Sequence, residues 1–502
     1  MKQGKVMLVG AGPGDEKLIT VKGMEAICRA DVILYDRLAN PKLLTYAKDG
    51  CELIYGGKLP KRHFLRQEAI NQALVEKALE GKLVVRLKGG DPNVFGRVGE
   101  EAEALAQYGI PFEIVPGITS GIAAPAYAGI PVTHREFGGS FAVVTAHDKS
   151  KDGKPSINWE GLASGVDTIA FYMGVANLSY ICDNLKKHGK SPGTPVILIQ
   201  WGTFGRQQTL EGTLDTIAEK AEAVQFKNPA ITLVGDIVSL RDKTKWFEKK
   251  PLHGRQILLA RTGVKKSDLA EKLTEQGADV FEFPKMKNVR IPTDTSRKRV
   301  LENIETYETI IFSSPESIEI FFEDLFKAGK DIRSIKANLF GGSSKSVREL
   351  NKCGFQAEVA GNLNAIHSGE PALIVGEDSI YGQRWFFALQ YDQYELFTTH
   401  VAKVDESYFP IFKRMIEDAE LNTVIFPCAK SAGLLKDALK QAGMDADAML
   451  APLQAACFGE QSGQAARRHG IINTSIAESP DAEGIISLLD KTNSQCASVE
   501  KV

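Results

Sequence analysis

The first half of the chain alternates short apolar runs with amphipathic stretches. The apolar runs predict strands at Val6–Val9, Val32–Tyr35, Lys82–Leu87, Phe112–Val115, Phe141–Thr145, Thr168–Tyr172, Val196–Ile199 and Ala230–Val234. Helical patterns lie between many of them, for example at Gln67–Glu80 and Glu100–Tyr108. This alternation is typical of α/β architecture with mainly parallel sheets. A break at Val115-Pro116-Gly117 predicts two lobes, about 1–115 and 116–248.

The second half starts a new α/β pattern after a short polar segment. This segment, residues 249–253, is predicted to be a linker. The α/β pattern resumes at Gly254 and runs to about residue 490, and residues 491–502 are predicted to be a tail. Two segments of this half are echoed later: Ile310–Ser317 by Val424–Ser431, and Phe340–Ser344 by Phe458–Ser462. The echo predicts two related lobes, one inserted within the other. A chance repeat of common strand–turn–helix chemistry is the alternative.

Composition narrows the class of protein. Of 502 residues, 43% are hydrophobic and 25% are charged, which is typical of globular proteins. A net charge of −2 gives no reason to expect nucleic acid or a membrane surface as partner. No apolar run reaches the roughly 18 residues that span a bilayer, and Met1–Lys5 has no signal-peptide pattern. Seven scattered cysteines without a C-x-x-C motif indicate reduced thiols, a cytoplasmic location and no metal site.

Glycine-rich turns follow three of the predicted strands. The first, Val9–Asp15, has the spacing G-x-G-x-G rather than the nucleotide-binding G-x-G-x-x-G. Pro13 has no N–H to offer a phosphate, so this turn suits shaping a pocket. Similar turns occur at Lys88–Pro92 and Val115–Gly121. Turns at the carboxyl ends of parallel strands line the binding crevice, although each alone is also explained as a tight connection without a ligand.

These turns, with Tyr35–Leu38, Gly56–Lys58, Val94–Arg97 and Ala123–Arg135, resemble the uroporphyrinogen-III C-methyltransferases of the tetrapyrrole methyltransferase family over about residues 3–247. The resemblance implies S-adenosyl-L-methionine as donor, double methylation of uroporphyrinogen III to precorrin-2 for sirohaem or corrin synthesis, and a homodimer through this module. The family's donor contacts fall on Pro13, Gly89, Gly90, Asp91, Val94, Thr119, Ser120, Met173, Gly202 and Ala230. Val98 stands where the family has glycine. If that glycine has a positive φ, Val98 must shift the turn.

Asp36, directly after a predicted strand, matches the family's general base. Two alternative roles of Asp36 are a contact to an adenosine ribose and a structural role as a helix cap or in a salt bridge. Lys58 matches the family's proposed proton donor, against the ordinary reading of a solvated lysine. The substrate is a polycarboxylate, so cationic side chains are expected around it. The candidates, each of which is alternatively ordinary surface charge, are Arg37, Arg97, His134, Arg135 and Arg206.

Residues 254–490 resemble uroporphyrinogen-III synthase, notably at Ile257–Arg261, Gly277–Val280, Thr309–Ser314 and Ala456–Gly470. The resemblance implies cyclisation of hydroxymethylbilane between two lobes joined by two crossover strands, one lobe at 254–290 plus 402–490 and an inserted lobe at 291–401. Candidate substrate contacts are Arg261, Ser313, Ser314, Ser343 and Ser462, although each serine equally suits a helix cap. We place His400 where the family usually has a tyrosine in the second crossover.

The sequence therefore predicts an α/β protein with a two-lobed methyltransferase module followed by a two-lobed synthase module. Three other readings stay open: a synthase-like module that binds without turnover, methylation of another precorrin, and a Rossmann oxidoreductase.

Overall fold

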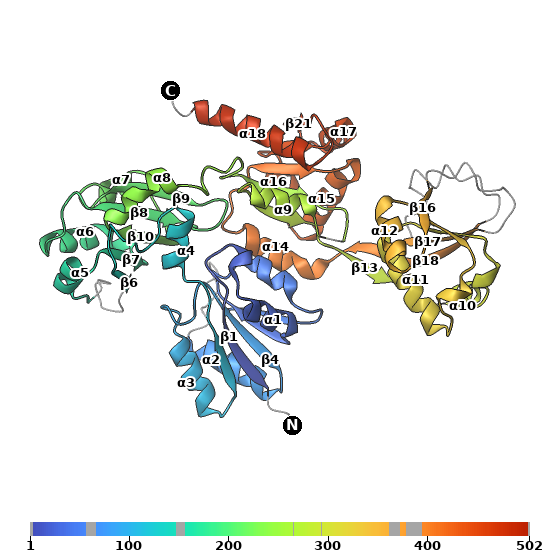
Figure 1. The fold of residues 1–502 in the computed structure, drawn as a ribbon, viewed down its shortest axis with the longest axis horizontal. Coiled ribbons are helices and arrows are strands. Elements are labelled where there is room, and N and C mark those ends of the chain that lie inside the picture. Colours follow the sequence, from blue (N-terminus) through green and yellow to red (C-terminus); the bar gives the residue numbers. More distant parts are fainter. Residues whose placement is uncertain are drawn as a thin grey trace. The chain divides into compact units, whose positions relative to one another are not determined.

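The computed structural model describes residues 4–56, 67–146, 156–264, 266–292, 294–360, 372–377 and 394–499. These residues form four sheets with helices packed on them, which confirms the α/β class (Figure 1). By contacts, the chain divides into two compact units. The first comprises 1–261, 266–283 and 407–502, and the second comprises 262–265 and 284–406.

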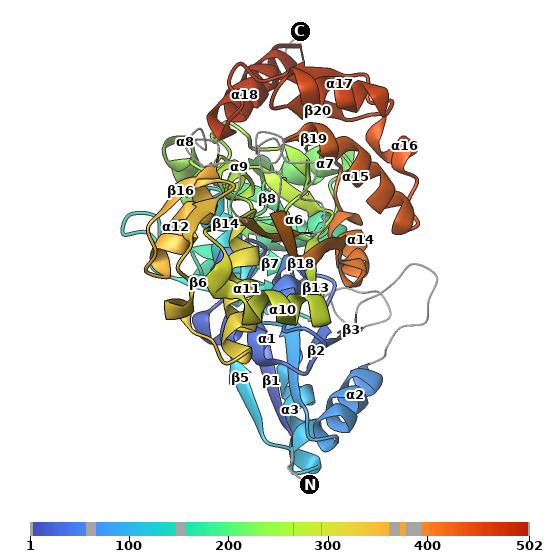
Figure 2. The same ribbon diagram turned by 90° about the vertical axis from the view of Figure 1, so that its right-hand side faces the viewer.

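The first sheet is wholly parallel, with the order β3-β2-β4-β1-β5. Its strands are β1 (Lys5–Gly10), β2 (Val32–Tyr35), β3 (Glu52–Tyr55), β4 (Leu83–Lys88) and β5 (Phe112–Val115). Its helices are α1 (Val21–Arg29), α2 (Gln67–Leu79) and α3 (Val98–Gln107). Helices α2 and α3 lie side by side, and their apolar residues form one core with β1 and β4 (Figure 2). Because all five strands run parallel, their carboxyl ends lie at the same edge of the sheet.

The second sheet has the order β6-β7-β10-β8-β9 and is mixed, because only β6 and β7 pair in parallel. Its strands are β6 (Phe141–Thr145), β7 (Thr168–Tyr172), β8 (Pro195–Gln200), β9 (Gln208–Thr213) and β10 (Ala230–Val234). The expectation of mainly parallel sheets is wrong for this lobe. The connection between β8 and β9 is short enough for an antiparallel pair, whereas a parallel pair needs a long crossover. Its helices are α4 (Ser120–Tyr127), α5 (Trp159–Gly165), α6 (Leu178–Lys187), α7 (Ile217–Ala223) and α8 (Arg241–Thr244).

The third sheet, also in the first unit, is parallel with the order β12-β11-β19-β20-β21. Its strands are β11 (Gln256–Ala260), β12 (Asp279–Phe283), β19 (Thr423–Phe426), β20 (Gln454–Cys457) and β21 (Thr474–Ile476). Its helices are α9 (Asp268–Glu275), α14 (Phe409–Ile416), α15 (Ala429–Gln441), α16 (Ala446–Leu450), α17 (Glu460–Arg468) and α18 (Ala482–Val499). Strand β11 pairs with β19 although the whole second unit lies between them in sequence.

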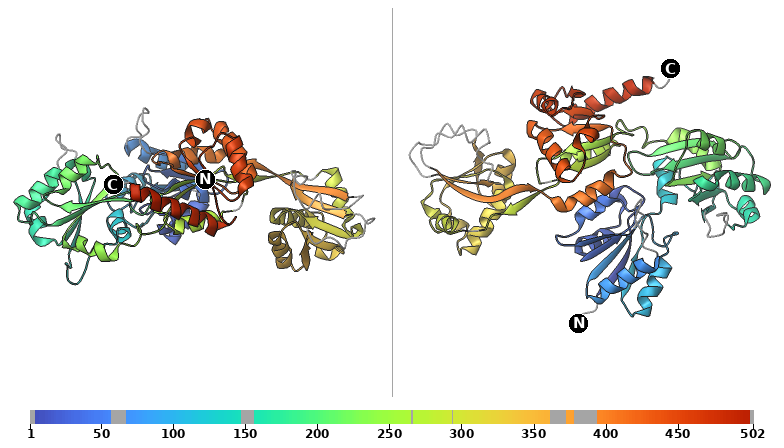
Figure 3. Two further views of the ribbon diagram at one scale, coloured as in Figure 1. Left: turned by 90° about the horizontal axis from the view of Figure 1, so that it is seen from above. Right: turned by 180° about the vertical axis from the view of Figure 1, so that it is seen from behind.

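The second unit contains one sheet with the order β13-β18-β17-β14-β15-β16. Its strands are β13 (Met286–Arg290), β14 (Thr309–Phe312), β15 (Asn338–Gly341), β16 (Ala357–Val359), β17 (Ala372–Glu377) and β18 (Tyr394–Val404). Its helices are α10 (Thr295–Glu302), α11 (Pro315–Lys327) and α12 (Ser344–Lys352). Strand β13 runs antiparallel to the long strand β18, as Figure 3 shows, and the other pairings are parallel. Phe312, Phe321 and Phe397 anchor its core.

The internal echo corresponds to a shared helix start. In α11, α15 and α17 a serine at the third helical position, Ser317, Ser431 or Ser462, donates its hydroxyl to the carbonyl of the capping residue. In α12 the equivalent residue is Ser346, so the sequence alignment of Ser344 with Ser462 is wrong by two positions. The same three hydroxyls accept the N–H of the capping residue, so each serine satisfies one donor and one acceptor at its helix start.

Short 3-10 helices complete the described elements: η1 (Glu16–Leu18), η2 (Pro41–Tyr46), η3 (Val175–Asn177), η4 (Asp236–Leu240), η5 (Ile304–Thr306), η6 (Ile332–Ser334) and η9 (Glu406–Tyr408). Within the described ranges, no helix has the length and apolar content to cross a membrane.

Candidate active site

Three glycine-containing turns meet where the first sheet ends. The Gly90 N–H donates to the Gly12 carbonyl at 2.7 Å, and the Gly12 N–H donates to the Gly90 carbonyl at 3.2 Å. Gly117 packs against both turns, because a Cβ there would lie 2.3 Å from the Gly90 carbonyl oxygen and 2.9 Å from the Gly10 Cα. Gly12 and Gly90 have φ values of +76° and +69°. Only glycine tolerates this conformation and this backbone approach, so the turns form one fixed cradle.

One side of this cradle is open. A Cβ at Gly90 would meet its first neighbours only at 3.9 Å, at the Ser120 nitrogen and the Thr119 Cα. Thr119 Oγ1 lies 2.5 Å from the Tyr172 hydroxyl, and Met173, the next residue, has a φ of +57°. Gly90, Thr119 and Ser120 therefore surround one open space. Met173 directly follows Tyr172, whose hydroxyl contacts Thr119.

The remaining predicted donor contacts have identifiable local roles. The Asp91 carboxylate accepts the Asn93 N–H at 2.7 Å and the Gly117 N–H at 3.0 Å, and so ties two of the turns together. Gly202 lies against α4, where a Cβ would come within 2.4 Å of the Ala124 Cβ. The other four are placed by their elements: Pro13 lies in the first turn, Gly89 directly follows β4, Val94 donates its N–H to the Asp91 carbonyl, and Ala230 begins β10.

The turn before α3 leads into Val98, which has a helical conformation. Its left-handed residues are Phe95 and Arg97, with φ values of 55° and 58°. Val98 is the first residue of α3 and packs against the core of the first lobe. The left-handed conformation thus falls on Arg97, the residue before Val98, and a shift of this turn relative to the glycine-containing relatives stays a prediction.

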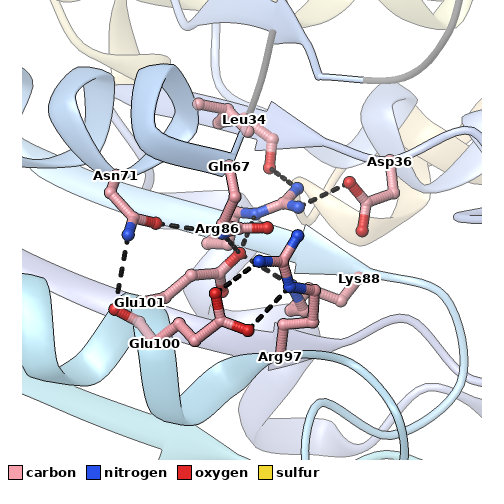
Figure 4. A network of polar contacts seen from close by, with 9 residues as sticks. All are labelled: Leu34, Asp36, Gln67, Asn71, Arg86, Lys88, Arg97, Glu100 and Glu101. Atoms are coloured by element: carbon pink, nitrogen blue, oxygen red, sulfur yellow. Dashed lines mark hydrogen bonds and ion pairs between the residues drawn. The ribbon is translucent and has the colours of Figure 1, made fainter. Parts of the chain in front are cut away.

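Asp36, directly after β2, belongs to a buried network of charges (Figure 4). Its Oδ1 accepts a hydrogen bond from Arg86 Nη2 at 2.5 Å, while its side chain stays 31% exposed. Arg86 lies on β4 with a side chain only 2% exposed, and its Nη1 also reaches the Leu34 carbonyl. One oxygen of the carboxylate is thus fixed from the protein side, and the group remains accessible from outside.

Glu101 of α3 completes the network. Its Oε1 accepts from Arg86 Nε at 3.0 Å and from Lys88 Nζ at 2.8 Å, and its side chain is 0% exposed. Burial, reinforced by the neighbouring Arg86, lowers the pKa of Lys88. Two carboxylates therefore balance two cations, and all of these groups except Asp36 are nearly inaccessible to solvent. Sequence reasoning missed Arg86, Lys88 and Glu101, although two cations in an otherwise apolar strand were a readable signal.

The predicted cationic contacts do not all lie together. Arg97 is exposed and forms a paired contact with Glu100, with Nε 2.8 Å from Oε1, beside the charge network. Arg37 pairs with Asp418 at 2.7 Å. His134 and Arg135 lie in a turn closed by backbone hydrogen bonds between residues 134 and 138, and Arg135 is exposed. Lys58 lies outside the described residues.

Arg206 is held inside the protein. Its guanidinium carbon lies 4.3 Å from the centroid of the Trp201 ring, and its Nε is 3.7 Å from Asp279 Oδ2 at the start of β12. The side chain is 10% exposed, and burial lowers the pKa of its guanidinium. The structure thus brings Arg206 to Asp279 rather than to Asp36, because stacking and ion pairing compensate its burial.

In the synthase segment, the predicted serines cap helices. Ser314 and Ser343 accept the N–H groups of Ser317 and Ser346, and Ser462 bonds to the Gly459 carbonyl. Ser313 differs, since its buried hydroxyl has no hydrogen-bond partner in the described part of the chain. Arg261 Nε lies 3.1 Å from Glu282 Oε1, a carboxyl whose pKa is raised by burial.

His400 lies on β18 and is 2% exposed. Its Nδ1 lies 2.8 Å from the Thr399 hydroxyl, and burial lowers the pKa of the imidazole. Over the described ranges, no three His, Cys, Asp or Glu side chains are grouped to hold a metal ion.

Comparisons with known proteins follow the same division. Residues 5–218 match the family model of tetrapyrrole (corrin/porphyrin) methylases, and residues 267–366 match that of uroporphyrinogen-III synthase HemD. A Bacillus subtilis (strain 168) uroporphyrinogen-III C-methyltransferase is 47% identical over 463 residues, covering 92% of this chain and 93% of that protein. A Ruminiclostridium josui protein, porphyrin biosynthesis protein HemD, is 36% identical over 487 residues, covering 94% and 95%.

Among solved structures, the Thermus thermophilus uroporphyrin-III C-methyl transferase complexed with S-adenyl homocysteine is 35% identical, with a TM-score of 0.41. It spans 47% of this chain and 100% of that one.

Proposed function

The chain belongs to the uroporphyrinogen-III C-methyltransferase family, and from that premise we propose a bifunctional enzyme of tetrapyrrole biosynthesis. The first module methylates uroporphyrinogen III twice and gives precorrin-2 for sirohaem or corrin synthesis. The second module closes hydroxymethylbilane to uroporphyrinogen III. The observation that carries the proposal is the Asp36 carboxylate, fixed by Arg86 and placed beside the glycine cradle.

The cradle fits S-adenosyl-L-methionine. The open side of Gly90 faces the start of α4, where the Ser120 N–H is available to a carboxylate. No phosphate has to be bound, so Pro13 in the first turn is no handicap. The residues that would hold the donor are Pro13, Gly89, Gly90, Asp91, Val94, Thr119, Ser120, Met173, Gly202 and Ala230. When bound, this donor supplies an electrophilic methyl group on a sulfonium.

Asp36 is the proposed general base. A Cβ at Gly89 would lie 2.9 Å from the Leu38 Cβ, so the turn that begins with Asp36 touches the cradle directly. Asp36 accepts a proton that the macrocycle loses when one of its pyrrole rings is methylated, while Arg86 holds the carboxylate in place. Lys58 is the proposed proton donor. Asp91 acts by tying the turns together as well as by facing the donor.

Cationic groups near this turn suit a polycarboxylate. Arg97 is exposed beside the network, and its planar guanidinium can pair with a carboxylate through two hydrogen bonds. Arg37, His134 and Arg135 are the further proposed contacts. Arg206 is a weaker candidate, because its side chain is only 10% exposed, whereas Arg37 and Arg97 are paired but more than 40% exposed.

For the second module, the hydroxyl of Ser313, which has no hydrogen-bond partner among the residues that the structure describes, supports binding of an acidic side arm of hydroxymethylbilane. Arg261, Ser314, Ser343 and Ser462 are the further proposed contacts. The buried His400 favours a second candidate, a module that binds the substrate without turnover. An imidazole with a lowered pKa replaces the phenol expected from the family at this strand.

A single incubation tests both proposed activities. The protein is given hydroxymethylbilane and methyl-labelled donor, and the products are analysed for mass and isomer. Type-III product with two labelled methyl groups supports both activities. Only type-I product contradicts synthase activity. In a second incubation, uroporphyrinogen III is supplied directly. Its recovery without label contradicts the methyltransferase assignment, and another precorrin is then the substrate to test.

We also propose that the protein is a homodimer through the first module, as the family resemblance implies. Light scattering coupled to gel filtration measures this directly, and a monomer over the working concentration range contradicts it.

A further inference from the structure

The turn after β2 is held by residues from the far end of the chain. Arg414, on α14, donates from Nη2 to the Arg37 carbonyl oxygen at 2.8 Å. Asp418, just past the end of α14, lies with Oδ1 2.7 Å from Arg37 Nη2. All three residues belong to the same compact unit. The backbone and the side chain of the residue next to Asp36 are thus both bonded to the synthase segment.

Arg414 also reaches the end of the neighbouring strand. Its guanidinium carbon lies 5.5 Å from the centroid of the Tyr55 ring, and Tyr55 packs against Tyr35 with ring centroids 5.3 Å apart. The Gly56 N–H donates to the Tyr35 carbonyl at 2.9 Å. A single side chain therefore touches the ends of β2 and β3. In sequence these strands lead into Asp36 and, two residues after Gly56, into Lys58.

The side chain of Arg414 is also held in place by two nearby carboxylates, those of Glu417 and Asp418. Its side chain is 8% exposed, its Nη1 donates to Glu417 Oε2 at 2.5 Å, and Asp418 Oδ2 lies 3.4 Å from both terminal nitrogens. An exposed ion pair contributes little to stability. A buried guanidinium bonded to a carbonyl and two carboxylates is much stronger and more directional. These contacts are therefore suited to setting the position of the turn.

We propose that Arg414 and Asp418, which belong to the synthase segment, are positioning residues for C-methylation. They act through Arg37 to hold the Asp36 carboxylate at the donor cradle. This inference rests on the proposed function. Its physical basis is the steep dependence of rate on geometry, since a misplacement of about 1 Å can cost up to about 10²-fold.

The test uses the full chain with Arg414→Met and Asp418→Asn. Lys413→Met is the matched control, because it removes a cation from an exposed position of the same helix. Uroporphyrinogen III and labelled donor are supplied directly, so synthase activity does not enter. We expect kcat to fall by about 10-fold in Arg414→Met, with donor affinity by calorimetry within twofold of wild type. Arg414→Lys, which keeps one donor for the Arg37 carbonyl, should recover part of kcat.

Hydrogen exchange provides a second readout that does not depend on the substrate. The Asp36 N–H bonds to the Leu87 carbonyl and the Ala39 N–H bonds to the Asp36 carbonyl. Both amides should exchange faster in Arg414→Met and Asp418→Asn than in Lys413→Met. Unchanged exchange, or kcat within twofold of wild type, overturns the inference. If the wild-type protein does not methylate uroporphyrinogen III, the proposed function fails, and the exchange rates alone decide whether Arg414 holds the turn.

Discussion

At the scale of residues, the Asp36 carboxylate is bonded to the buried Arg86 on one side and is accessible to solvent on the other. Arg86 Nη2 fixes one carboxylate oxygen, and the Asp36 side chain stays 31% exposed. The position of Asp36 after a strand was predicted from the sequence. Its partners were not, because β4 and α3 are brought together only by folding.

Replacing Asp36 by Asn tests its role as base. The amide oxygen can still accept from Arg86, so the turn should keep its conformation, while the proton acceptor is lost. We expect methylation to slow by about 10²-fold or more with donor affinity unchanged. Single-turnover kinetics with labelled donor measure the rate, and calorimetry measures the affinity. Turnover equal to wild type rejects the base assignment.

Replacing Glu101 by Gln tests the buried network. The change leaves Arg86 and Lys88 without their shared carboxylate, and uncompensated buried charge typically costs about 3–5 kcal/mol. Urea unfolding, followed by far-UV circular dichroism, should show this loss as a lower free energy of unfolding. The control is Glu100→Gln, whose exposed pair with Arg97 contributes at most about 1 kcal/mol. Equal effects of the two variants contradict the network's role.

At the scale of elements, Arg241 joins α8 to the edge of the second sheet. Its Nε lies 2.6 Å from Glu211 Oε1 on β9, and its Nη2 lies 2.7 Å from Glu248 Oε2. Strand β9 was not predicted, because its alternating polar residues give no apolar run. β3 was missed for a related reason, since its apolar run is only three residues long, Leu53–Tyr55 after Glu52. Completely buried strands such as β2 were found at their exact limits.

The same cluster predicts a pH dependence of stability. Burial would raise the pKa of Glu248, but hydrogen bonds from Arg241, Lys245 and Gln207 outweigh it and lower that pKa to about 2. The unfolded chain has a glutamate pKa of about 4.3. The folded pKa is the lower one, so this contribution, on the order of 2–3 kcal/mol, is present above about pH 4.3 and is lost as the pH falls toward 2.

The measurement is the free energy of unfolding as a function of pH. Between about pH 4.3 and 2, wild-type protein should lose more stability than Glu248→Gln, which has no group to titrate. Parallel acid limbs for the two proteins would show that Glu248 contributes nothing in this range.

At the scale of the whole molecule, the methyltransferase segment and the third sheet share a dry contact within one compact unit. Gly205 donates its N–H to Asp279 Oδ1 at 3.0 Å and accepts the Gly254 N–H at 2.9 Å. A Cβ at Gly205 would lie 2.4 Å from the Asp279 nitrogen. Together with the Arg206–Asp279 pair, this contact joins the two modules, and we expect it to couple their stabilities.

Asp279→Ala should therefore weaken both modules together. The change removes the acceptor of Gly205 and leaves Arg206 buried without its carboxylate, at a cost of about 3–5 kcal/mol. Scanning calorimetry should show a lower transition temperature and a separation of the transitions of the two modules. The exposed Asp437→Ala should change stability by no more than about 0.5 kcal/mol. An unaltered melting profile in Asp279→Ala would refute the coupling.

The sequence by itself determined the α/β class, most strands of the first module and the glycine turns, because these depend on local apolar runs and on backbone freedom. It also placed Asp36 at a strand end. Only the tertiary structure decided that Arg86 and Glu101 surround Asp36, that Arg206 faces Asp279, and that Arg414 holds Arg37. Those contacts join residues far apart in the chain, and the energy that selects them comes from burial and charge pairing, which no local pattern encodes.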